Sequence, residues 1–497
     1  MLQTGQQRPA DAAPETEPAG TRLAAPHPVR ARSWSDWSAS SITAGFLAVL
    51  VSFTGPLAIF YQAAQAAQVD SAAFASWVWG ISIGAALSGI LLSWMLRAPI
   101  ITAWSAPGTA LLISLFPGLS LNEAIGAYLT AAAILLAIGL SGSFERLMAH
   151  VPNGVASGMM AGILLPFGLN AFRSTATLPL LACGMIVAYL VFRRWVPRYS
   201  VLLLLVAGVL LAFFSGVTHF SGVELQLVAP QFIAPAWSWS STFSLALPLV
   251  LVTLAGQYLP GMAVLKTSGY DTNVRTIMTV NSVASLAVAV TGGITIAIAA
   301  ITAAMCTGPD AHEDPRRRYV AGIANGVFYL LAGLCGGSIV MLFAALPKEL
   351  VVTLAGLALL GPITANLAVI VAAEDHRDAS VITFLATASG MSFLGLGSAF
   401  WGIVIGMLAY WILHARSKKQ AWKQAWKRRE SSSNEGSQFK RHQRLRRHVS
   451  CDTSTSTRSP TRRNSTASTP CSWCGAPLSS SVTATTSPSR GSQFLRS

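Results

Sequence analysis

Ala98-Pro-Ile-Ile-Thr-Ala-Trp-Ser-Ala-Pro-Gly-Thr109 is a β-type stretch, interrupted by proline and glycine, that lies among long apolar runs. Gly292-Gly-Ile-Thr-Ile-Ala-Ile-Ala-Ala-Ile-Thr302 has the same character in the second half of the apolar region. Each opens a short apolar segment. We predict that each begins as extended chain and continues as a half-helix, because paired, interrupted spans at corresponding positions mark the binding sites of many transporters.

The chain around these stretches is almost continuously apolar from Ile42 to His414. A membrane crossing needs about 20 apolar helical residues, and the runs 74–96, 176–192 and 398–413 approach or exceed that length without an interior charge. Of all residues, 53% are hydrophobic and 11% are charged, whereas a soluble domain has about 25% charged residues. The composition excludes a soluble fold and predicts an all-α membrane protein.

The apolar runs predict about 14 transmembrane segments. Their approximate bounds are 42–62, 74–96, 99–117, 121–141, 151–170, 176–193, 199–217, 242–266, 274–291, 292–307, 319–345, 349–371, 379–394 and 397–413.

A faint internal repeat divides these segments into two sets of seven. Val51-Ser-Phe-Thr-Gly-Pro56 matches Val252-Thr-Leu-Ala-Gly-Gln257, and the same offset aligns Asp70 with Asp271. Because seven is odd, the second copy must enter the membrane from the opposite side. The sequence therefore predicts a 7+7 inverted-repeat transporter, with short β-type stretches opening spans 3 and 10.

The basic residues between spans predict the orientation, because cytoplasmic loops are enriched in Lys and Arg. With the N-terminus inside, the outer loops carry Arg173 and Lys348. The inner loops carry Arg97, Arg146, Arg193, Arg194, Arg198, Lys266, Arg275, Arg316, Arg317, Arg318 and Arg377. We therefore expect a multi-pass inner-membrane protein with both termini in the cytoplasm.

Composition predicts three regions: a disordered N-terminus (1–37), a membrane domain (38–414) and a disordered basic tail (415–497). The tail holds 17 of the 34 Lys and Arg but only 3 of the 19 acidic residues. Its Lys418–Arg429 stretch, with Trp422 and Trp426, is typical of a helix lying on anionic lipids. We expect no nucleic-acid binding, since basic runs are commonly solvated. Whether the tail is native or an out-of-frame translation stays open.

The two β-type stretches supply the candidate binding residues. An extended stretch followed by a half-helix leaves free backbone N–H groups at mid-membrane, and with the helix dipole these suit an anionic substrate. Trp104 would form a flat apolar wall. Hydroxyl groups would come from Thr102, Ser105, Thr295 and Thr302. For each single hydroxyl, close helix packing is the alternative explanation.

Two further segments are expected to bend near the site. Thr54-Gly55-Pro56 should break or kink the first span, and Gly256-Gln257 with Pro260-Gly261 should do so in the eighth. A buried amide is costly unless it is paired, so Gln257 either bonds to a neighbouring helix or meets the substrate. Thr54, Gly55 and Gln257 are therefore candidate binding residues.

At these residues the chain resembles the BenE family of bacterial benzoate:proton symporters over about residues 33–414. The matching stretches are Ser52-Phe-Thr-Gly-Pro56, Pro99-Ile-Ile-Thr-Ala-Trp-Ser-Ala-Pro-Gly108, Val151-Pro-Asn-Gly-Val-Ala-Ser-Gly-Met-Met-Ala-Gly162, Gly308-Pro-Asp-Ala-His312 and Asp314-Pro-Arg-Arg-Arg-Tyr319.

The resemblance implies a carrier, not an enzyme, that imports benzoate or a similar aromatic carboxylate by proton symport and alternating access. It needs no cofactor or metal besides the coupling proton. The related fold of nucleobase and sulfate/bicarbonate transporters implies a core (spans 1–4 and 8–11), a gate (spans 5–7 and 12–14) and a possible homodimer. A nucleobase or inorganic-anion carrier of the same fold is the alternative.

One departure from the related nucleobase carriers concerns proton coupling. They place glutamates in spans 8 and 10, where this chain has Gln257 and, by approximate alignment, Ile301. No acidic residue is predicted at mid-membrane, although intramembrane carboxylates are the usual proton relays. We hypothesise that the substrate carboxyl group itself carries the proton.

Overall fold

The computed structural model describes residues 36–116, 118–218, 224 and 226–413. The predictions of disorder for residues 1–35, and all those for the tail from residue 415 onward, concern residues outside this part. Asp36, placed by the sequence in the N-terminal region, is buried in the membrane unit.

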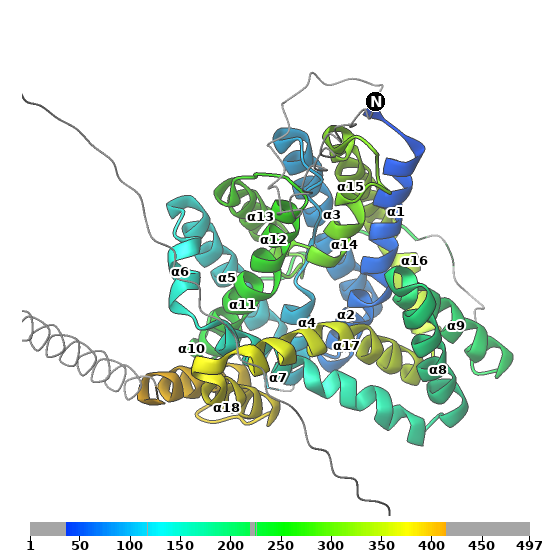
Figure 1. The fold of residues 1–497 in the computed structure, drawn as a ribbon. Coiled ribbons are helices and arrows are strands. Elements are labelled where there is room, and N and C mark those ends of the chain that lie inside the picture. The colour runs from blue at the N-terminus through cyan, green and yellow to red at the C-terminus, as the bar shows by residue number, and fades with distance from the viewer. Residues whose placement is uncertain (1–35, 117, 219–223, 225, 414–497) are drawn as a thin grey trace, which may run out of the picture. The chain divides into compact units, whose positions relative to one another are not determined.

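The described part is a helical protein with one small sheet (Figure 1). The α-helices and strands of the first half are α1 (Ala39–Thr54), α2 (Pro56–Ala66), α3 (Ser71–Leu96), β1 (Thr102–Trp104), α4 (Ala106–Leu115), α5 (Leu121–Ser141), α6 (Phe144–His150), α7 (Asn153–Arg173), α8 (Pro179–Trp195) and α9 (Ser200–Phe214). Those of the second half are α10 (Trp239–Ser241), α11 (Leu247–Thr253), α12 (Leu259–Thr267), α13 (Val274–Ala289), β2 (Ile296–Ile298), α14 (Ala300–Thr307), α15 (Tyr319–Leu334), α16 (Gly336–Ala344), α17 (Lys348–Ala372), α18 (Arg377–Ala388) and a final helix, Ser398–Leu413.

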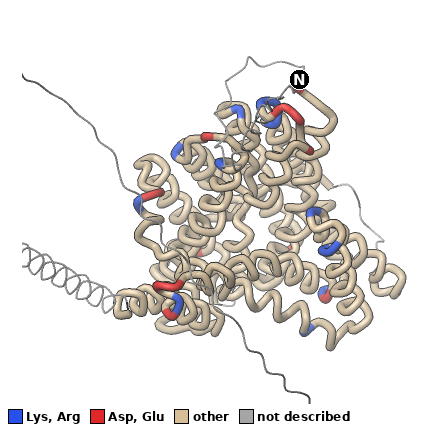
Figure 2. Tube along the Cα trace, viewed as in Figure 1, with Lys and Arg blue, Asp and Glu red and all other residues tan. Residues whose placement is uncertain are grey.

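Seven of the described helical stretches are long and apolar enough to cross a membrane. They are Ala39–Ala66, Ser71–Leu96, Leu121–Ser141, Asn153–Ala176, Pro197–Phe214, Trp239–Thr267 and Lys348–Ala372. Lys, Arg, Asp and Glu lie at helix ends, in short helices and in connections, and leave the middles of these helices free of charge (Figure 2). This confirms a mostly helical membrane protein.

The predicted span 319–345 is not one straight helix. It divides into α15 and α16, which are bent by 69° relative to each other. The break falls at Cys335, directly before Gly336 and Gly337. The extended segment 226–238 packs there: a Cβ atom on Gly337 would lie 2.9 Å from the Gln226 carbonyl oxygen. The bend is therefore accompanied by a contact with a distant segment that the apolar pattern does not reveal.

The helices pack mainly in two groups. In the first group, α3 packs on α15 and α13, α5 packs on α13, and α1 packs on α15 and α14. In the second group, α7 packs on α17 and α18, while α8 packs on α9 and α17. The final helix joins the second group, because a Cβ atom on its Gly402 or Gly406 would contact Thr387 or Thr383 of α18. α2 and α4 also contact α17 and α7, so they lie between the groups.

For the eighth span the sequence predicted a break or kink at Gly256-Gln257 and Pro260-Gly261, and the structure shows no break there. Trp239–Thr267 runs as one helical stretch that contains two π-helical turns, η4 (Thr242–Ala246) and η5 (Leu254–Tyr258). Each π turn ends two residues before a proline, Pro248 or Pro260. Proline lacks the N–H group and clashes with the carbonyl four residues earlier. One extra residue in the turn accommodates this without a break, and such bulges recur at functional sites.

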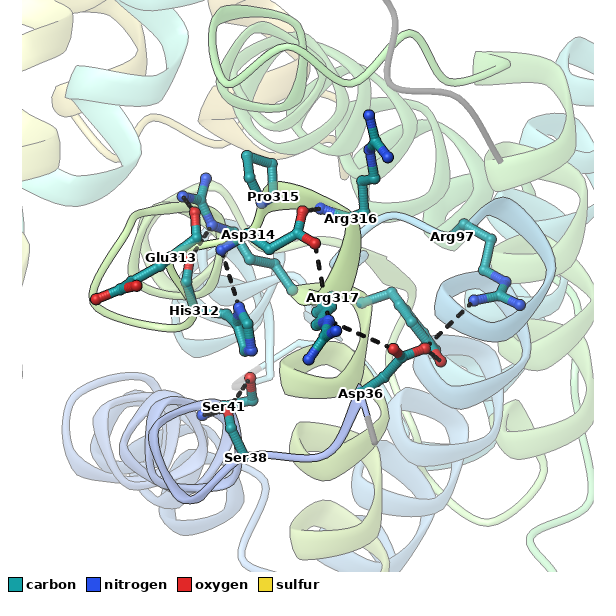
Figure 3. A network of polar contacts seen from close by, with 12 residues as sticks. Asp36, Ser38, Ser41, Arg97, His312, Glu313, Asp314, Pro315, Arg316 and Arg317 are labelled. Atoms are coloured by element: carbon teal, nitrogen blue, oxygen red, sulfur yellow. Dashed lines mark hydrogen bonds and ion pairs between the residues drawn. The ribbon is translucent and has the colours of Figure 1, made fainter. Parts of the chain in front are cut away.

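A buried carboxylate ties the first helix group together at the end of α3. Asp36 lies between two arginines, with its Oδ2 atom 3.9 Å from Arg97 and its Oδ1 atom 3.5 Å from Arg317 (Figure 3). The Tyr319 hydroxyl donates to Asp36 at 3.0 Å, and the Arg97 guanidinium lies 4.7 Å from the Tyr319 ring centroid. A buried charge is stable only when it is paired and hydrogen-bonded in this way. Asp36 thus holds the start of α1 against α3 and α15.

We expect Gly45→Ala to lower the free energy of unfolding by about 1–3 kcal/mol. The melting temperature of the detergent-solubilised protein should fall accordingly. The new Cβ atom would lie 2.7 Å from both the Ala321 carbonyl oxygen and the Asn325 backbone nitrogen, so α1 and α15 must separate. Gly361→Ala in α17 is the control, because a Cβ atom there meets nothing within 4 Å. Equal melting temperatures for both variants would contradict the packing of α1 on α15.

Candidate substrate site

The two β-type stretches meet as an antiparallel strand pair. Thr102 pairs with Ile298, Ala103 with Ala297 and Trp104 with Ile296. The ladder continues at both ends, because the Ser105 N–H group donates to the Thr295 carbonyl at 2.9 Å and the Ala299 N–H group donates to the Ile101 carbonyl at 3.0 Å. The extended starts predicted for spans 3 and 10 are therefore adjacent, and they satisfy each other's backbone groups.

A glycine shapes the approach to the second strand. Gly292 has a φ of +88°, in the left-handed region that favours glycine. A Cβ atom there would lie 1.9 Å from the Trp77 ring, so a side chain is also excluded by contact. The chain can therefore turn tightly against α3 before it enters β2.

The register divides the predicted residues between the two faces of the strand pair, since side chains alternate along a strand. Thr102 and Trp104 share one face with Ile296 and Ile298. The other face carries Ala103, Ser105, Thr295 and Ala297, which we call the small-residue face.

Thr102 faces α3 and serves the scaffold. Its hydroxyl donates to the Ala85 carbonyl at 2.7 Å and accepts a hydrogen bond from the Ser88 hydroxyl at 3.2 Å. Both hydrogen-bonding functions are therefore already occupied within the protein. The packing alternative stated for single hydroxyls is the better description of Thr102.

Trp104 belongs to a buried aromatic cluster. Its ring centroid lies 5.7 Å from that of Phe53, 6.5 Å from that of Phe60 and 6.2 Å from that of Tyr329. The Phe53 and Tyr329 rings meet it edge to face, a favourable geometry for aromatic pairs. Its indole Nε1 atom is buried and has no hydrogen-bond partner among the described residues.

Ser105 and Thr295 lie together on the small-residue face, and Thr253 joins them from the eighth span. The Thr253 and Thr295 hydroxyl oxygens are 3.4 Å apart, and all three side chains are buried. Thr253 is not among the binding residues predicted from the sequence. The repeat itself held the signal, since Thr253 and Ser52 occupy the same place in the two matching segments.

The two half-helices leave the strand pair in opposite directions, so both positive helix ends point back toward it. Ser105 caps α4, because its hydroxyl accepts the Gly108 N–H bond at 3.2 Å. α14 has no such side-chain cap at Ala299. Among the described residues, the first N–H groups of α14 make no hydrogen bond. An anion would satisfy these N–H groups.

The remaining predicted residues lie around the strand pair without a described side-chain contact to it. Thr54 ends α1 and its hydroxyl donates to the Leu50 carbonyl at 2.6 Å. Gly55 separates α1 from α2 and faces Ala358 of α17 and Val201 of α9. Thr302 lies in the first turn of α14 and donates to the Ala299 carbonyl at 3.4 Å.

Gln257 lies in the second π turn, η5, and is half-buried. No hydrogen bond of its side chain is found among the described residues, so the first of its two expected roles, pairing with a neighbouring helix, has no support there. Its neighbour Gly256 faces the second helix group, because a Cβ atom on Gly256 would lie 2.6 Å from the Met160 methyl carbon of α7.

A hollow of about 180 Å³ lies at the start of α18 and beside the final helix. Its lining includes Glu374, Asp375 and Asp378, with His376 and Arg377. An excess of carboxylates repels an anion, so we place the candidate site at the strand pair. Across the described part of the chain, no three His, Cys, Asp or Glu side chains are grouped in a way that could hold a metal ion.

Comparison with known proteins decides the family. The profile of the family described as "Benzoate membrane transport protein" (BenE) matches residues 35–412. The "Benzoate membrane transport protein" of Acinetobacter baylyi (strain ATCC 33305 / BD413 / ADP1) is 57% identical over 378 residues, which cover 76% of this chain and 96% of that protein. This chain belongs to the BenE family.

A second relative is the "Inner membrane protein YdcO" of Escherichia coli (strain K12). It is 40% identical over 374 residues, covering 75% of this chain and 96% of that protein. Membership of a family of membrane transport proteins makes this chain a multi-pass transporter of the inner membrane and not an enzyme. The resemblance stated from the sequence is confirmed.

A solved structure adds evidence about the fold alone. The murine Solute Carrier 26 family member A9 anion transporter, in the inward-facing state, matches with a TM-score of 0.57 at 14% identity. The match covers 78% of this chain and 70% of that chain. The BenE chain therefore has the fold of this class of membrane transporter.

Thr102→Val and Thr295→Val should affect stability differently. Thr102→Val removes a buried hydrogen bond to a carbonyl, so we expect a loss of about 1 kcal/mol and a lower melting temperature in detergent. Thr295→Val should leave the melting temperature unchanged, because the one described contact of its hydroxyl is 3.4 Å long. A larger loss for Thr295→Val would assign this hydroxyl to the scaffold.

Proposed function

We propose that this BenE protein imports benzoate or a similar aromatic carboxylate across the inner membrane by proton symport. The observation that carries the proposal is the strand pair β1–β2, with a half-helix starting at each strand's end and small hydroxyl-bearing residues on one face. The names of the family and of its 57% identical relative support benzoate as the substrate.

The carboxylate would bind without a full positive charge. The described Lys and Arg residues lie outside the middles of the membrane helices. The hydroxyls of Ser105 and Thr295 would replace water around the carboxylate at one end of the strand pair. The uncapped amides of α14 would face the substrate from the other end, where Ala299 pairs with Ile101. Dipoles held in a water-free environment act strongly on a charge at this position.

The aromatic ring of the substrate would extend past the end of the strand pair to Trp104, which lies on the opposite face from Ser105 and Thr295. Trp104 supplies a flat apolar surface there, and its buried Nε1 donor has no described partner. Phe53, which is partly exposed, meets the Trp104 ring edge to face and would border the same space.

The coupling proton would travel on the substrate carboxyl group. Among the described residues no Asp or Glu lies in the middle of a membrane helix, so the usual relay is missing. Gln257 offers both a donor and an acceptor, which suits the neutral acid form of a carboxylic acid. Ile301, the second residue of α14, is 66% exposed and offers no titratable group.

Transport would follow alternating access in a 7+7 inverted repeat of 14 spans. In this proposal the first helix group is the core (spans 1–4 and 8–11), and the second group is the gate (spans 5–7 and 12–14). In the two repeats α3 (span 2) would correspond to α13 (span 9), and α5 (span 4) to α15 (span 11). The packing of α3 on α15 and of α13 on α5 supports this relation, because each contact is the counterpart of the other. The antiparallel pairing of β1 with β2 supports the inversion.

The orientation follows from the basic loops. Two of the arginines assigned to the cytoplasmic side, Arg97 and Arg317, lie close together, because each forms an ion pair with Asp36. With Lys and Arg enriched inside, both termini would be cytoplasmic. The partners would be lipids, protons and the aromatic carboxylate, with a second copy of the chain as a possible gate-to-gate dimer.

Uptake of radiolabelled benzoate by cells that express the full chain tests the site. We expect Ser105→Leu to reduce uptake roughly tenfold or more, because the isobutyl group fills the small-residue face and displaces the α4 cap. Ser114→Leu is the control, since Ser114 is exposed on the same half-helix. Full transport by Ser105→Leu at equal expression would reject this placement of the site.

Proton coupling is tested in proteoliposomes with and without an imposed pH gradient. We expect benzoate to accumulate only when the outside is acidic, because the substrate enters with its proton. Equal accumulation in both conditions would reject symport. Unlabelled uracil and bicarbonate should not compete with benzoate; competition by either would favour the nucleobase or inorganic-anion alternative.

A further inference from the structure

The half-helix α14 is held by an arginine at the end opposite the candidate site. Arg318 is buried, and its guanidinium donates to the carbonyls of Thr307, at 2.6 Å, His312, at 2.7 Å, and Glu313, at 3.3 Å. The last carbonyls of a helix lack intrahelical partners and carry partial negative charge, so a cation there is favourable. Arg318 therefore fixes the C-terminal end of α14.

The connection after α14 is anchored to the first helix group by several other contacts. The Ser41 hydroxyl donates to the Ala311 carbonyl at 2.9 Å, and the Tyr270 hydroxyl donates to the Pro315 carbonyl at 2.7 Å. Asp36 holds Arg317 from the start of α1 (Figure 3). Residues 308–318 thus form a fixed platform on the first group.

A second arginine reaches this platform from the other helix group. Arg198 lies in the 3-10 turn between α8 and α9, and its NH1 group forms an ion pair with Asp310. Its NH2 group donates to the Met305 carbonyl, in the last turn of α14, at 2.9 Å. The ion pairs of Asp36 with Arg97 and Arg317 join elements within the first group, whereas Arg198–Asp310 joins the two groups.

The exposure of the two arginines differs in a way that bears on movement. The Arg318 side chain is enclosed by its three carbonyl acceptors, so its release would leave buried groups unpaired. The Arg198 and Asp310 side chains are 31% and 71% exposed. Water can replace both partners of an exposed ion pair at little cost. The Arg198 contact is therefore suited to break and re-form, while the Arg318 contact is suited to persist.

We propose that Arg198 is a positioning residue for transport, which latches the gate loop between α8 and α9 to the cytoplasmic end of α14 in one conformation and releases it in the other. The proposal rests on the alternating movement of the two helix groups described under the proposed function. Through α14, the latch connects the position of the gate to the half-helix whose opposite end meets the substrate.

Variants at the pair test this inference, with binding and transport measured separately. We expect Arg198→Ala and Asp310→Ala to change the maximal rate of benzoate uptake by about two- to fivefold, because an exposed pair stabilises its conformation by that factor. Equilibrium binding of benzoate to the purified protein should stay within about twofold, because neither side chain touches the site. Arg316→Ala is the control, an exposed arginine on the same platform whose side chain has no described partner.

In the charge-exchanged double variant, Arg198→Asp with Asp310→Arg, the maximal rate of benzoate uptake should return part of the way to the wild-type value. Each single charge reversal should not restore it. Wild-type rates in all single variants would overturn the latch. Loss of benzoate binding in the variants would also overturn it, since the residues would then act on the site itself.

A reducible thiol crosslinker between Arg198→Cys and Asp310→Cys, in a transport-competent background without other cysteines, tests the release step. We expect the crosslinked protein to bind benzoate but not transport it, and reduction to restore uptake. Undiminished transport by the crosslinked protein would show that transport does not require this contact to open and would refute the latch. If the wild type itself neither binds nor transports benzoate but transports another anion, the proposed substrate fails instead.

Discussion

Backbone N–H and C=O groups inside a membrane must be paired within the protein, and the structure depends on how residues 101–105 and 295–299 meet this requirement. Neither stretch is helical, and each supplies the hydrogen-bond partners of the other. Remove one strand and the other carries unpaired groups in an apolar surrounding, where each costs several kcal/mol. The pairing therefore fixes the two halves of the chain to each other at the candidate site.

The surroundings of the strand pair separate support from binding. On one face of the pair, the Thr102 hydroxyl is bonded to α3 and the Trp104 ring packs on Phe53 and Tyr329. The opposite face has small and hydroxyl-bearing side chains, and the amides that start α14 lack a cap. At its other end α14 is held by Arg318 within its own group and by Arg198 from the second group. The short helix thus connects the site to the boundary between the groups.

Much of this arrangement was predictable from local pattern. The half-helices, the strand character of residues 102–104 and 296–298, and the break at Gly55 all follow from proline, glycine and apolar run length. The π turns before Pro248 and Pro260, and the bend after α15, were not predicted. A proline in the sequence indicates that the backbone hydrogen bonds of a helix are interrupted. It does not determine whether the helix breaks or widens into a π turn, because neighbouring helices decide which form packs better.

The sequence by itself determined that the chain is a helical membrane protein of the BenE family and which two stretches interrupt its helices, since hydropathy and motifs act locally. Only the tertiary structure decided the register that puts Ser105 beside Thr295 and turns Thr102 toward α3. It also decided that Asp36 is buried between arginines and that Arg198 meets Asp310. These contacts join residues far apart in the chain, and their partners are selected by packing, which no local pattern encodes.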